Sequence, residues 1–112
     1  MATDITVPLK TSAENLRFMV YDIVNQIPRG YVLTYGAIAT LCGFPNHSRL
    51  VGRIMRTCPE DTLPCHRVVN ASGRLAPHFP QQASLLEAEG VVLNASGKVP
   101  LSKYLWRINE HD

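Results

Sequence analysis

The fold of this protein is decided by residues 34–57, which read TYGAIATLCGFPNHSRLVGRIMRT. Thr34 is placed to cap a helix over about 35–42, and the turn 43–46 separates this helix from a second one over about 47–57. Two short helices across a glycine-containing turn are typical of a helix-turn-helix, although many small domains pair helices in this way. The stretch therefore predicts a mainly α domain that contains a helix-turn-helix.

The second of these helices separates charged from apolar residues. At about 100° per residue, three arginines fall on one side of the helix and four apolar residues on the opposite side. Gly52 lies at the margin of the basic side, where a missing side chain lets the backbone approach a partner closely. The basic side indicates a docking face, with an ordinary solvated helix face as the alternative. The arginines are Arg49, Arg53 and Arg56, and the apolar residues are Leu50, Val51, Ile54 and Met55.

Length and composition favour a globular protein with a single modest core. The chain has 112 residues, of which 46% are hydrophobic and 18% charged, and its net charge of +2 does not by itself indicate a nucleic-acid partner. No apolar run approaches the roughly 20 residues of a membrane helix, and the N-terminus lacks the features of a signal peptide. We therefore expect an intracellular, cytoplasmic protein without membrane contact, with a flexible lead-in over 1–10 and a single domain over 11–108.

The segments on either side add one long helix, one short helix and two short extended stretches. A capping box at Thr11-Ser12-Ala13-Glu14 precedes an apolar helical stripe, and residues 28–30 end that helix. Residues 31–35 and the end of 63–69 are predicted to be extended. The stripe consists of Leu16, Met19, Val20, Ile23, Val24 and Ile27.

Turn and loop residues dominate the last third of the chain. Residues 70–73 form a predicted turn, and residues 74–82 form a predicted loop because Pro77 and Pro80 break regular structure. A helix from Gln82 to Glu89 ends at Gly90, and a polar, hairpin-like tail follows.

Three cysteines bear on the redox chemistry, namely Cys42, Cys58 and Cys65. An odd count without a Cys-x-x-Cys pair or a secretion signal argues against a disulfide framework. A zinc site that combines all three with His66 is arithmetically possible, but the spacing matches no common zinc module. We therefore predict neither a metal nor another cofactor.

Cys65-His66-Arg67 places two basic groups beside one of these cysteines, and a thiol acts as a nucleophile only as the thiolate. In an extended segment the side chains of Cys65 and His66 would point to opposite sides, so contact would need a bent backbone or a bridging water. From spacing alone, a buried and inert cysteine is the alternative.

Pro64-Cys65-His66-Arg67-Val68 resembles the active-site signature of the O6-alkylguanine-DNA alkyltransferases. The resemblance extends from about Leu16 to Gly90 and includes Thr34-Tyr35-Gly36, Arg49-Leu50-Val51-Gly52 and Leu86-Glu87-Ala88-Glu89-Gly90 in the same order. It implies the winged-helix-like C-terminal domain of that family. It also implies that the partner is double-stranded DNA containing O6-alkylguanine, bound by a monomer.

The resemblance implies a role for each site residue. Cys65 takes the alkyl group in a single turnover, His66 draws off the thiol proton through a water, and Glu89 orients His66. Tyr35 donates a proton to the guanine, and Arg49 enters the duplex in place of the flipped nucleotide. Gly52, Arg53 and Arg56 belong to the DNA-binding helix. The alternatives are a core tyrosine for Tyr35, a surface acid for Glu89 and a phosphate contact for Arg49.

The sequence departs from the family pattern in two places near the predicted site. Cys58-Pro59 replaces the usual Asn-Pro, and residues 75–80 replace the Tyr-Ser-Gly-Gly loop of the base pocket. The small size and the Tyr104-Leu105-Trp106-Arg107 ending resemble the alkyltransferase-like proteins. Those proteins bind O6-alkylguanine without removing the alkyl group and recruit nucleotide excision repair proteins. They usually carry tryptophan or alanine where this chain has Cys65.

Three other functions therefore compete with alkyl transfer to Cys65. The first is a non-catalytic lesion sensor that acts with nucleotide excision repair proteins. The others are a transcriptional helix-turn-helix module and a thiol-based redox or metal protein.

Overall fold

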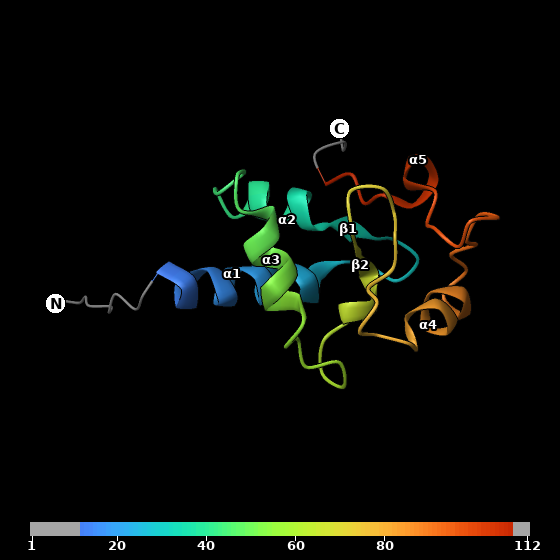
Figure 1. Ribbon diagram of the computed structural model, residues 1–112, viewed down its shortest axis with the longest axis horizontal. Coiled ribbons are helices and arrows are strands. Elements are labelled where there is room, and N and C mark those ends of the chain that lie inside the picture. The colour runs from blue at the N-terminus through green and yellow to red at the C-terminus, as the bar shows by residue number, and fades with distance from the viewer. Residues whose placement is uncertain (1–11, 109–112) are drawn as a thin grey trace, which may run out of the picture.

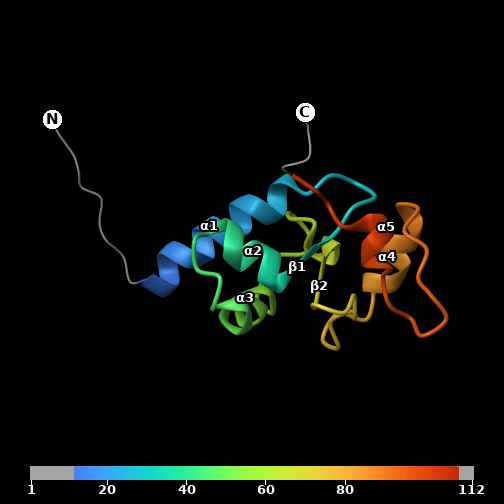
Figure 2. The same ribbon diagram turned by 90° about the horizontal axis from the view of Figure 1, so that it is seen from above.

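The computed structural model describes residues 12–108, so the predicted lead-in over 1–10 and the capping residue Thr11 lie outside the described residues. The fold is mainly α with short β segments, as predicted. Helices α1, α2 and α3 lie at one end, α4 and α5 lie at the other, and the two strands lie between them (Figures 1 and 2). The elements are α1 (Ser12–Gln26), β1 (Leu33–Thr34), α2 (Tyr35–Leu41), α3 (Ser48–Met55), the 3-10 turn η2 (Cys65–Arg67), β2 (Val68–Val69), α4 (Gln82–Ala88) and α5 (Leu101–Tyr104).

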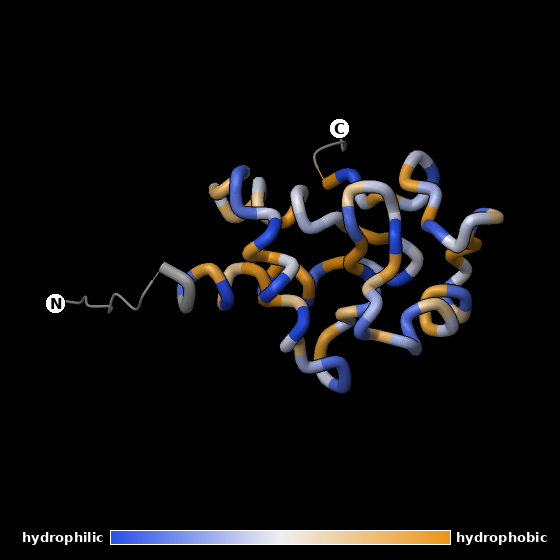
Figure 3. The backbone as a smooth tube through the Cα atoms, viewed as in Figure 1, coloured by the Kyte–Doolittle hydropathy of each residue, from blue (hydrophilic) through white to orange (hydrophobic). Residues whose placement is uncertain are grey.

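The apolar stripe of α1 faces the core, as its spacing predicts. Leu16, Val20 and Val24 are buried, and Ile27 is buried directly after the helix ends. These side chains share one cluster with buried residues of α2 and α3, and the hydrophobic positions gather where these elements and the strands face one another (Figure 3). Burial of this stripe, rather than the propensity of α1 alone, stabilises the helix in its position.

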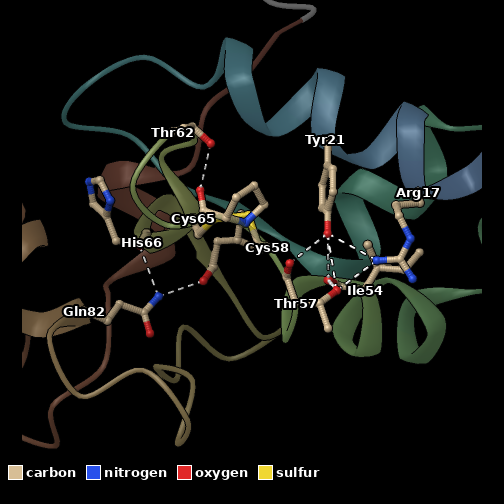
Figure 4. Close-up of a disulfide and its surroundings, with 11 residues drawn as sticks. Arg17, Tyr21, Ile54, Thr57, Cys58, Thr62, Cys65, His66 and Gln82 are labelled. Atoms are coloured by element: carbon tan, nitrogen blue, oxygen red, sulfur yellow. Dashed lines mark hydrogen bonds between the residues drawn. A yellow bond between two sulfur atoms is a disulfide. The ribbon is translucent and has the colours of Figure 1, made fainter.

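The helix-turn-helix forms where the sequence predicts it. The Thr34 hydroxyl accepts a hydrogen bond of 3.0 Å from the Ala37 amide and so caps α2. α3 is shorter than the predicted 47–57, because the amides of Arg56 and Thr57 bond to carbonyls three residues back. The Thr57 hydroxyl also donates to the Ile54 carbonyl, and the Tyr21 hydroxyl of α1 donates to the Thr57 carbonyl at 3.1 Å (Figure 4). α1 therefore fixes the end of α3.

Three distant segments meet in the small sheet. β1 and β2 are parallel, with Leu33 beside Val68 and Thr34 beside Val69. On the other side of β1, Val32 forms an isolated parallel bridge with Leu105. The predicted hairpin-like tail contains a turn, in which the Asn94 amide bonds to the Lys98 carbonyl, but it forms the helix α5 rather than a paired strand. Backbone bonds to Val32, the residue before β1, hold this tail, and the sequence did not indicate them.

The turn at 70–73 is present as predicted, and the predicted loop at 74–82 is irregular up to residue 81, because Gln82 begins α4. Gly73 has a φ of +84°, and a Cβ there would overlap the Val99 carbonyl oxygen, so both conformation and space require glycine. Gly90 follows Glu89, the C-cap residue of α4, and has a φ of +87°, so it ends the helix as predicted. Within residues 12–108, no helix combines the length and the apolar character that crossing a membrane requires.

Candidate active site

Cys65 opens a bent segment rather than an extended one. It begins the 3-10 turn η2, which leads directly into β2, and it is only 5% exposed. Contact between Cys65 and His66 needs a bent backbone or a bridging water, and the backbone is bent here. The His66 ring nevertheless points away from the Cys65 sulfur (Figure 4). A proton would therefore have to travel from Cys65 to His66 through a bridging group.

Cys65 forms a disulfide with Cys58, which corrects the prediction that the cysteines are unpaired. The two Cα atoms lie 6.2 Å apart, within the usual range for a disulfide. Cys58 follows the turn, residues 56–57, that ends α3. The loop 58–65 turns back tightly because the Leu63 amide bonds to the Pro59 carbonyl at 2.9 Å. Cysteine count and spacing do not reveal such a pair, because the fold of this loop creates it. Cys42 is free and half-buried.

The zinc set considered from the sequence is not assembled. Two of its members, Cys58 and Cys65, are bonded to each other and cannot ligate a metal in this state. Over the described part of the chain, no group of three or more His, Cys, Asp and Glu side chains could hold a metal ion.

Glu89 holds the two residues that follow Cys65. One carboxylate oxygen lies 2.7 Å from His66 Nε2, and the Arg67 guanidinium binds both oxygens through Nε at 2.9 Å and Nη2 at 2.7 Å. The Gly30 amide donates a longer bond of 3.4 Å to the same carboxylate. The Glu89 side chain is 6% exposed, so these bonds are shielded from water. The fork-to-fork pair with Arg67 fixes the orientation of the carboxylate.

These contacts keep Glu89 ionised. Burial by itself raises the pKa of Glu89, but hydrogen bonds from Arg67 and His66, the charge of His66 and the Gly30 amide outweigh it and lower the pKa to about 2. An ionised carboxylate only accepts hydrogen bonds, so the proton between the two groups belongs to His66 Nε2. In neutral His66 the other ring nitrogen, Nδ1, is then left with a lone pair that can take a proton.

Gln82 ties the cysteine segment to the loop that follows it. Its side chain is fully buried, its Oε1 accepts a 2.7 Å bond from the Ala76 amide, and its Nε2 donates to the carbonyls of His66 and Val68 at 3.1 and 2.8 Å. One side chain therefore satisfies three backbone groups and fixes the 74–82 loop against η2 and β2.

Tyr35 lies where α2 meets α3. A Cβ on Gly52 would lie 3.6 Å from the Tyr35 ring, so the ring packs against the glycine of α3. Burial raises the pKa of Tyr35, and the positive charge of Arg56 offsets part of this rise. The phenol therefore keeps its proton near neutral pH and can donate it in a hydrogen bond.

α3 presents its cations to solvent, as its pattern predicts. Arg49, Arg53 and Arg56 are exposed, while Val51, Ile54 and Met55 are buried. Gly52 is half-exposed at the margin of the basic side.

A hollow of about 430 Å³ opens beside Tyr35, at the ends of the two parallel strands. Tyr35 directly follows β1 and Asn70 directly follows β2, so strand pairing brings the two together. The 74–82 loop closes the other side with Leu75, Ala76 and Pro77. Cys65 is not among the described residues that line this hollow.

Comparison with known proteins places the chain in a family. Residues 15–91 match the family model described as "6-O-methylguanine DNA methyltransferase, DNA binding domain". The chain belongs to this alkyltransferase family. It is 45% identical over 91 residues to the DNA base-flipping protein of Escherichia coli K12, an alignment that covers 78% of this chain and 70% of that protein. It is 35% identical over 92 residues to a methylated-DNA–protein-cysteine methyltransferase of Methanosarcina acetivorans, covering 80% of this chain and 56% of that protein.

A solved structure confirms the alkyltransferase-type helix-turn-helix fold. The crystal structure of Atl1 of Schizosaccharomyces pombe, in complex with damaged DNA containing O6-carboxymethylguanine, superposes with a TM-score of 0.75 at 36% identity. The match covers 84% of this chain and 96% of that chain. The family thus includes both proteins named as methyltransferases and proteins named for base flipping or likeness to alkyltransferases.

The structure brings some of the predicted site residues together, and it leaves Cys65 outside the hollow that Tyr35 lines. His66 and Glu89 are in contact, Gly52 packs on Tyr35, and the three arginines share one exposed face. Sequence reasoning missed three features of the site: the disulfide partner Cys58, the buried Gln82 and the pairing of Arg67 with Glu89. Cys58 stood out only as a departure from the family pattern, and nothing local to Gln82 signalled a buried bridging role.

We expect Glu89→Gln to destabilise the fold by about 2 kcal/mol at pH 7, because it removes charge-assisted hydrogen bonds from two partly buried partners. The folded-state pKa is depressed, so the stability from Glu89 is present above about pH 4.5 and is lost as the pH falls through about 2. Urea unfolding of both proteins from pH 7 down to pH 2 should therefore show a difference that shrinks below about pH 4.5. Glu87→Gln, an exposed change on the same helix, is the control, and an equal loss in both variants would contradict the prediction.

Proposed function

We propose that this protein recognises O6-alkylguanine in duplex DNA, rotates the damaged nucleotide out of the helix and accepts its alkyl group on Cys65 once. The observation that supports this most is the 2.7 Å contact of His66 with ionised Glu89, because it prepares a proton acceptor directly after a cysteine. We also propose that it acts as a monomer inside the cell, without a metal or other cofactor.

The arginine side of α3 and the hollow beside Tyr35 supply the DNA-binding part of this function. Cations on an exposed helix face neutralise phosphates, and the half-exposed Gly52 lets the backbone approach the duplex in the minor groove. A stacked base cannot present its O6 to a nucleophile, so the nucleotide must leave the stack. Arg49 fills the vacated position, while the hollow lined by Tyr35 and the 74–82 loop receives the base.

The transfer step follows from the groups around Cys65. His66 Nδ1 takes the thiol proton through a water, and the Cys65 thiolate attacks the alkyl carbon. A C–S bond forms as the C–O6 bond breaks, and the electron pair stays on the guanine, which takes a proton from Tyr35. The product is a stable thioether, so each molecule reacts once.

A second candidate is a non-catalytic lesion sensor that hands the damaged guanine to nucleotide excision repair proteins. The disulfide favours it, because a sulfur bonded to Cys58 is not a thiolate. The E. coli relative is also named for base flipping rather than for methyl transfer.

Reduced protein incubated with a duplex containing O6-methylguanine should gain one methyl group per molecule and then stop. Peptide mass spectrometry should place the methyl group on Cys65 and not on Cys42 or Cys58. Cys65→Ser should abolish transfer because a hydroxyl is a far poorer nucleophile, yet it should keep most of its lesion binding. Tight, selective binding by the reduced wild type with no adduct would leave the lesion sensor as the function.

Arg49→Ala should lower affinity for the lesion duplex more than for undamaged duplex, because its proposed role is to hold the flipped state. Arg53→Ala is the matched control on the same face and should weaken both duplexes about equally, reducing the salt slope of binding by about 1. Arg56 is a poorer control because its charge also acts on Tyr35. Fluorescence anisotropy at several salt concentrations measures both effects, and parallel losses in the two variants would remove the intruding role of Arg49.

Gly52→Ala should weaken duplex binding without weakening the fold. The added methyl would meet the Tyr35 ring at an ordinary contact distance of 3.6 Å, and alanine gains about 1 kcal/mol over glycine in a helix interior. Thermal unfolding should therefore show equal or higher stability, while anisotropy shows lower affinity for DNA. Asn25→Ala, an exposed change on α1, should leave DNA binding unchanged, and unaltered affinity in Gly52→Ala would refute a close approach at this position.

A further inference from the structure

The Cys58–Cys65 disulfide joins the turn that follows the proposed DNA-binding helix to the proposed alkyl acceptor (Figure 4). Both residues are buried, with 7% and 5% of their surfaces exposed. The bond uses the sulfur that alkyl transfer requires, since a thiolate and not a disulfide sulfur is the effective nucleophile. While the bond persists, Cys65 cannot accept an alkyl group.

The proposed lesion-binding surface is built from other residues. The exposed arginines of α3 and the hollow beside Tyr35 contain neither cysteine. We propose that the disulfide is a reversible redox modification that selects between the two activities of this site. The oxidised protein binds O6-alkylguanine without transferring the alkyl group, and the reduced protein transfers it. This inference rests on the proposed function.

A route for the reductant leads through a second hollow, which is lined by other residues than the hollow beside Tyr35. This open hollow of about 480 Å³ is lined by Cys58 together with Phe79, Gln81 and Leu85, and by the acidic pair Glu60 and Asp61. The first hollow uses Leu75, Ala76 and Pro77 of the same loop and shares no lining residue with the second. A small thiol can therefore reach Cys58 without entering the proposed base pocket. The two carboxylates favour neutral or cationic thiols over anionic ones.

The chemistry balances as ordinary thiol–disulfide exchange. A thiolate attacks the Cys58 sulfur, a mixed disulfide forms there, and Cys65 leaves as a thiolate directly before His66. A second thiol then releases Cys58, so two thiols are oxidised to one disulfide and both cysteines gain a proton. In the reverse direction a peroxide takes two electrons from the two cysteine thiols, and two water molecules form when the oxidant is hydrogen peroxide.

The expected cellular setting suits a reversible bond better than a structural one. Reducing compartments keep most thiols reduced, so disulfides there are usually transient, catalytic or redox-sensing. The loop closed between Cys58 and Cys65 is short, with a sequence separation of 7, so cross-linking it removes less chain entropy than closing a long loop would. The reduced protein, which transfers the alkyl group, is then the form present under ordinary reducing conditions. Oxidation stops the transfer while lesion binding persists.

The experiment compares peroxide-oxidised and dithiothreitol-reduced wild-type protein on the same O6-methylguanine duplex after the peroxide has been removed. Labelling with N-ethylmaleimide under denaturing conditions establishes the state of each sample: one labelled cysteine, Cys42, when oxidised and three when reduced. We expect both forms to bind the lesion with affinities within about threefold. We expect transfer to Cys65 to fall by roughly 100-fold or more in the oxidised form and to return after dithiothreitol is added.

Cys58→Ser removes the bond and keeps the acceptor, so it should transfer equally well with or without dithiothreitol when no peroxide is present. Cys58→Ala provides a second variant in case serine disturbs the buried position. Cys42→Ser is the matched control and should respond to oxidation and reduction as the wild type does.

Four outcomes separate this inference from the proposed function. Transfer by the oxidised wild type at the reduced rate, or three labelled cysteines after peroxide treatment, would overturn the redox selection and leave the transferase intact. Loss of lesion binding on oxidation would also overturn the selection. Absence of transfer by reduced wild type and by both Cys58 variants, with lesion binding retained, would overturn the transferase function and the selection with it.

Discussion

The Glu89 carboxylate at the end of α4 binds His66 and Arg67 of η2, and the remainder of the site depends on this contact. Arg67 continues the link to the end of α1 through a 2.7 Å bond to the Ile27 carbonyl. Arg29 returns from the same region to the Ala88 carbonyl at 3.0 Å. One buried carboxylate thus connects three segments that are remote in sequence, and it also sets the proton position on His66. Structural and chemical roles coincide here because charge-assisted hydrogen bonds are both strong and directional.

The segment from Cys58 to Gln82 contributes both to the disulfide and to the hollow beside Tyr35. Its first part carries the disulfide, and its last part divides the hollow beside Tyr35 from the hollow beside Cys58. Gln82 fixes this segment by bonding to the Ala76 amide and to the carbonyls of His66 and Val68. Proline-rich loops are seldom held by their own secondary structure, so a buried side chain that bonds three backbone groups is an effective substitute.

Local pattern predicted much of the fold and part of the site. The stripe of α1, the Thr34 cap and the two faces of α3 depend on periodicity and capping, which neighbouring residues alone define. The helix α5 and the bridge of Val32 to Leu105 escaped prediction, because backbone bonds between segments remote in sequence hold this tail in place. The signature around Cys65 indicated the family, which the match over residues 15–91 confirms.

The sequence by itself determined the helix-turn-helix, the basic face of α3 and membership of the alkyltransferase family. Tertiary structure alone decided that Cys58 lies against Cys65, that Arg67 shares Glu89 with His66, and that Gln82 is buried. The physical reason is the range of the interactions. Helix caps and amphipathic faces act within a few residues, whereas a disulfide or a buried ion pair exists only after chain folding has brought distant or unrelated side chains within bonding distance.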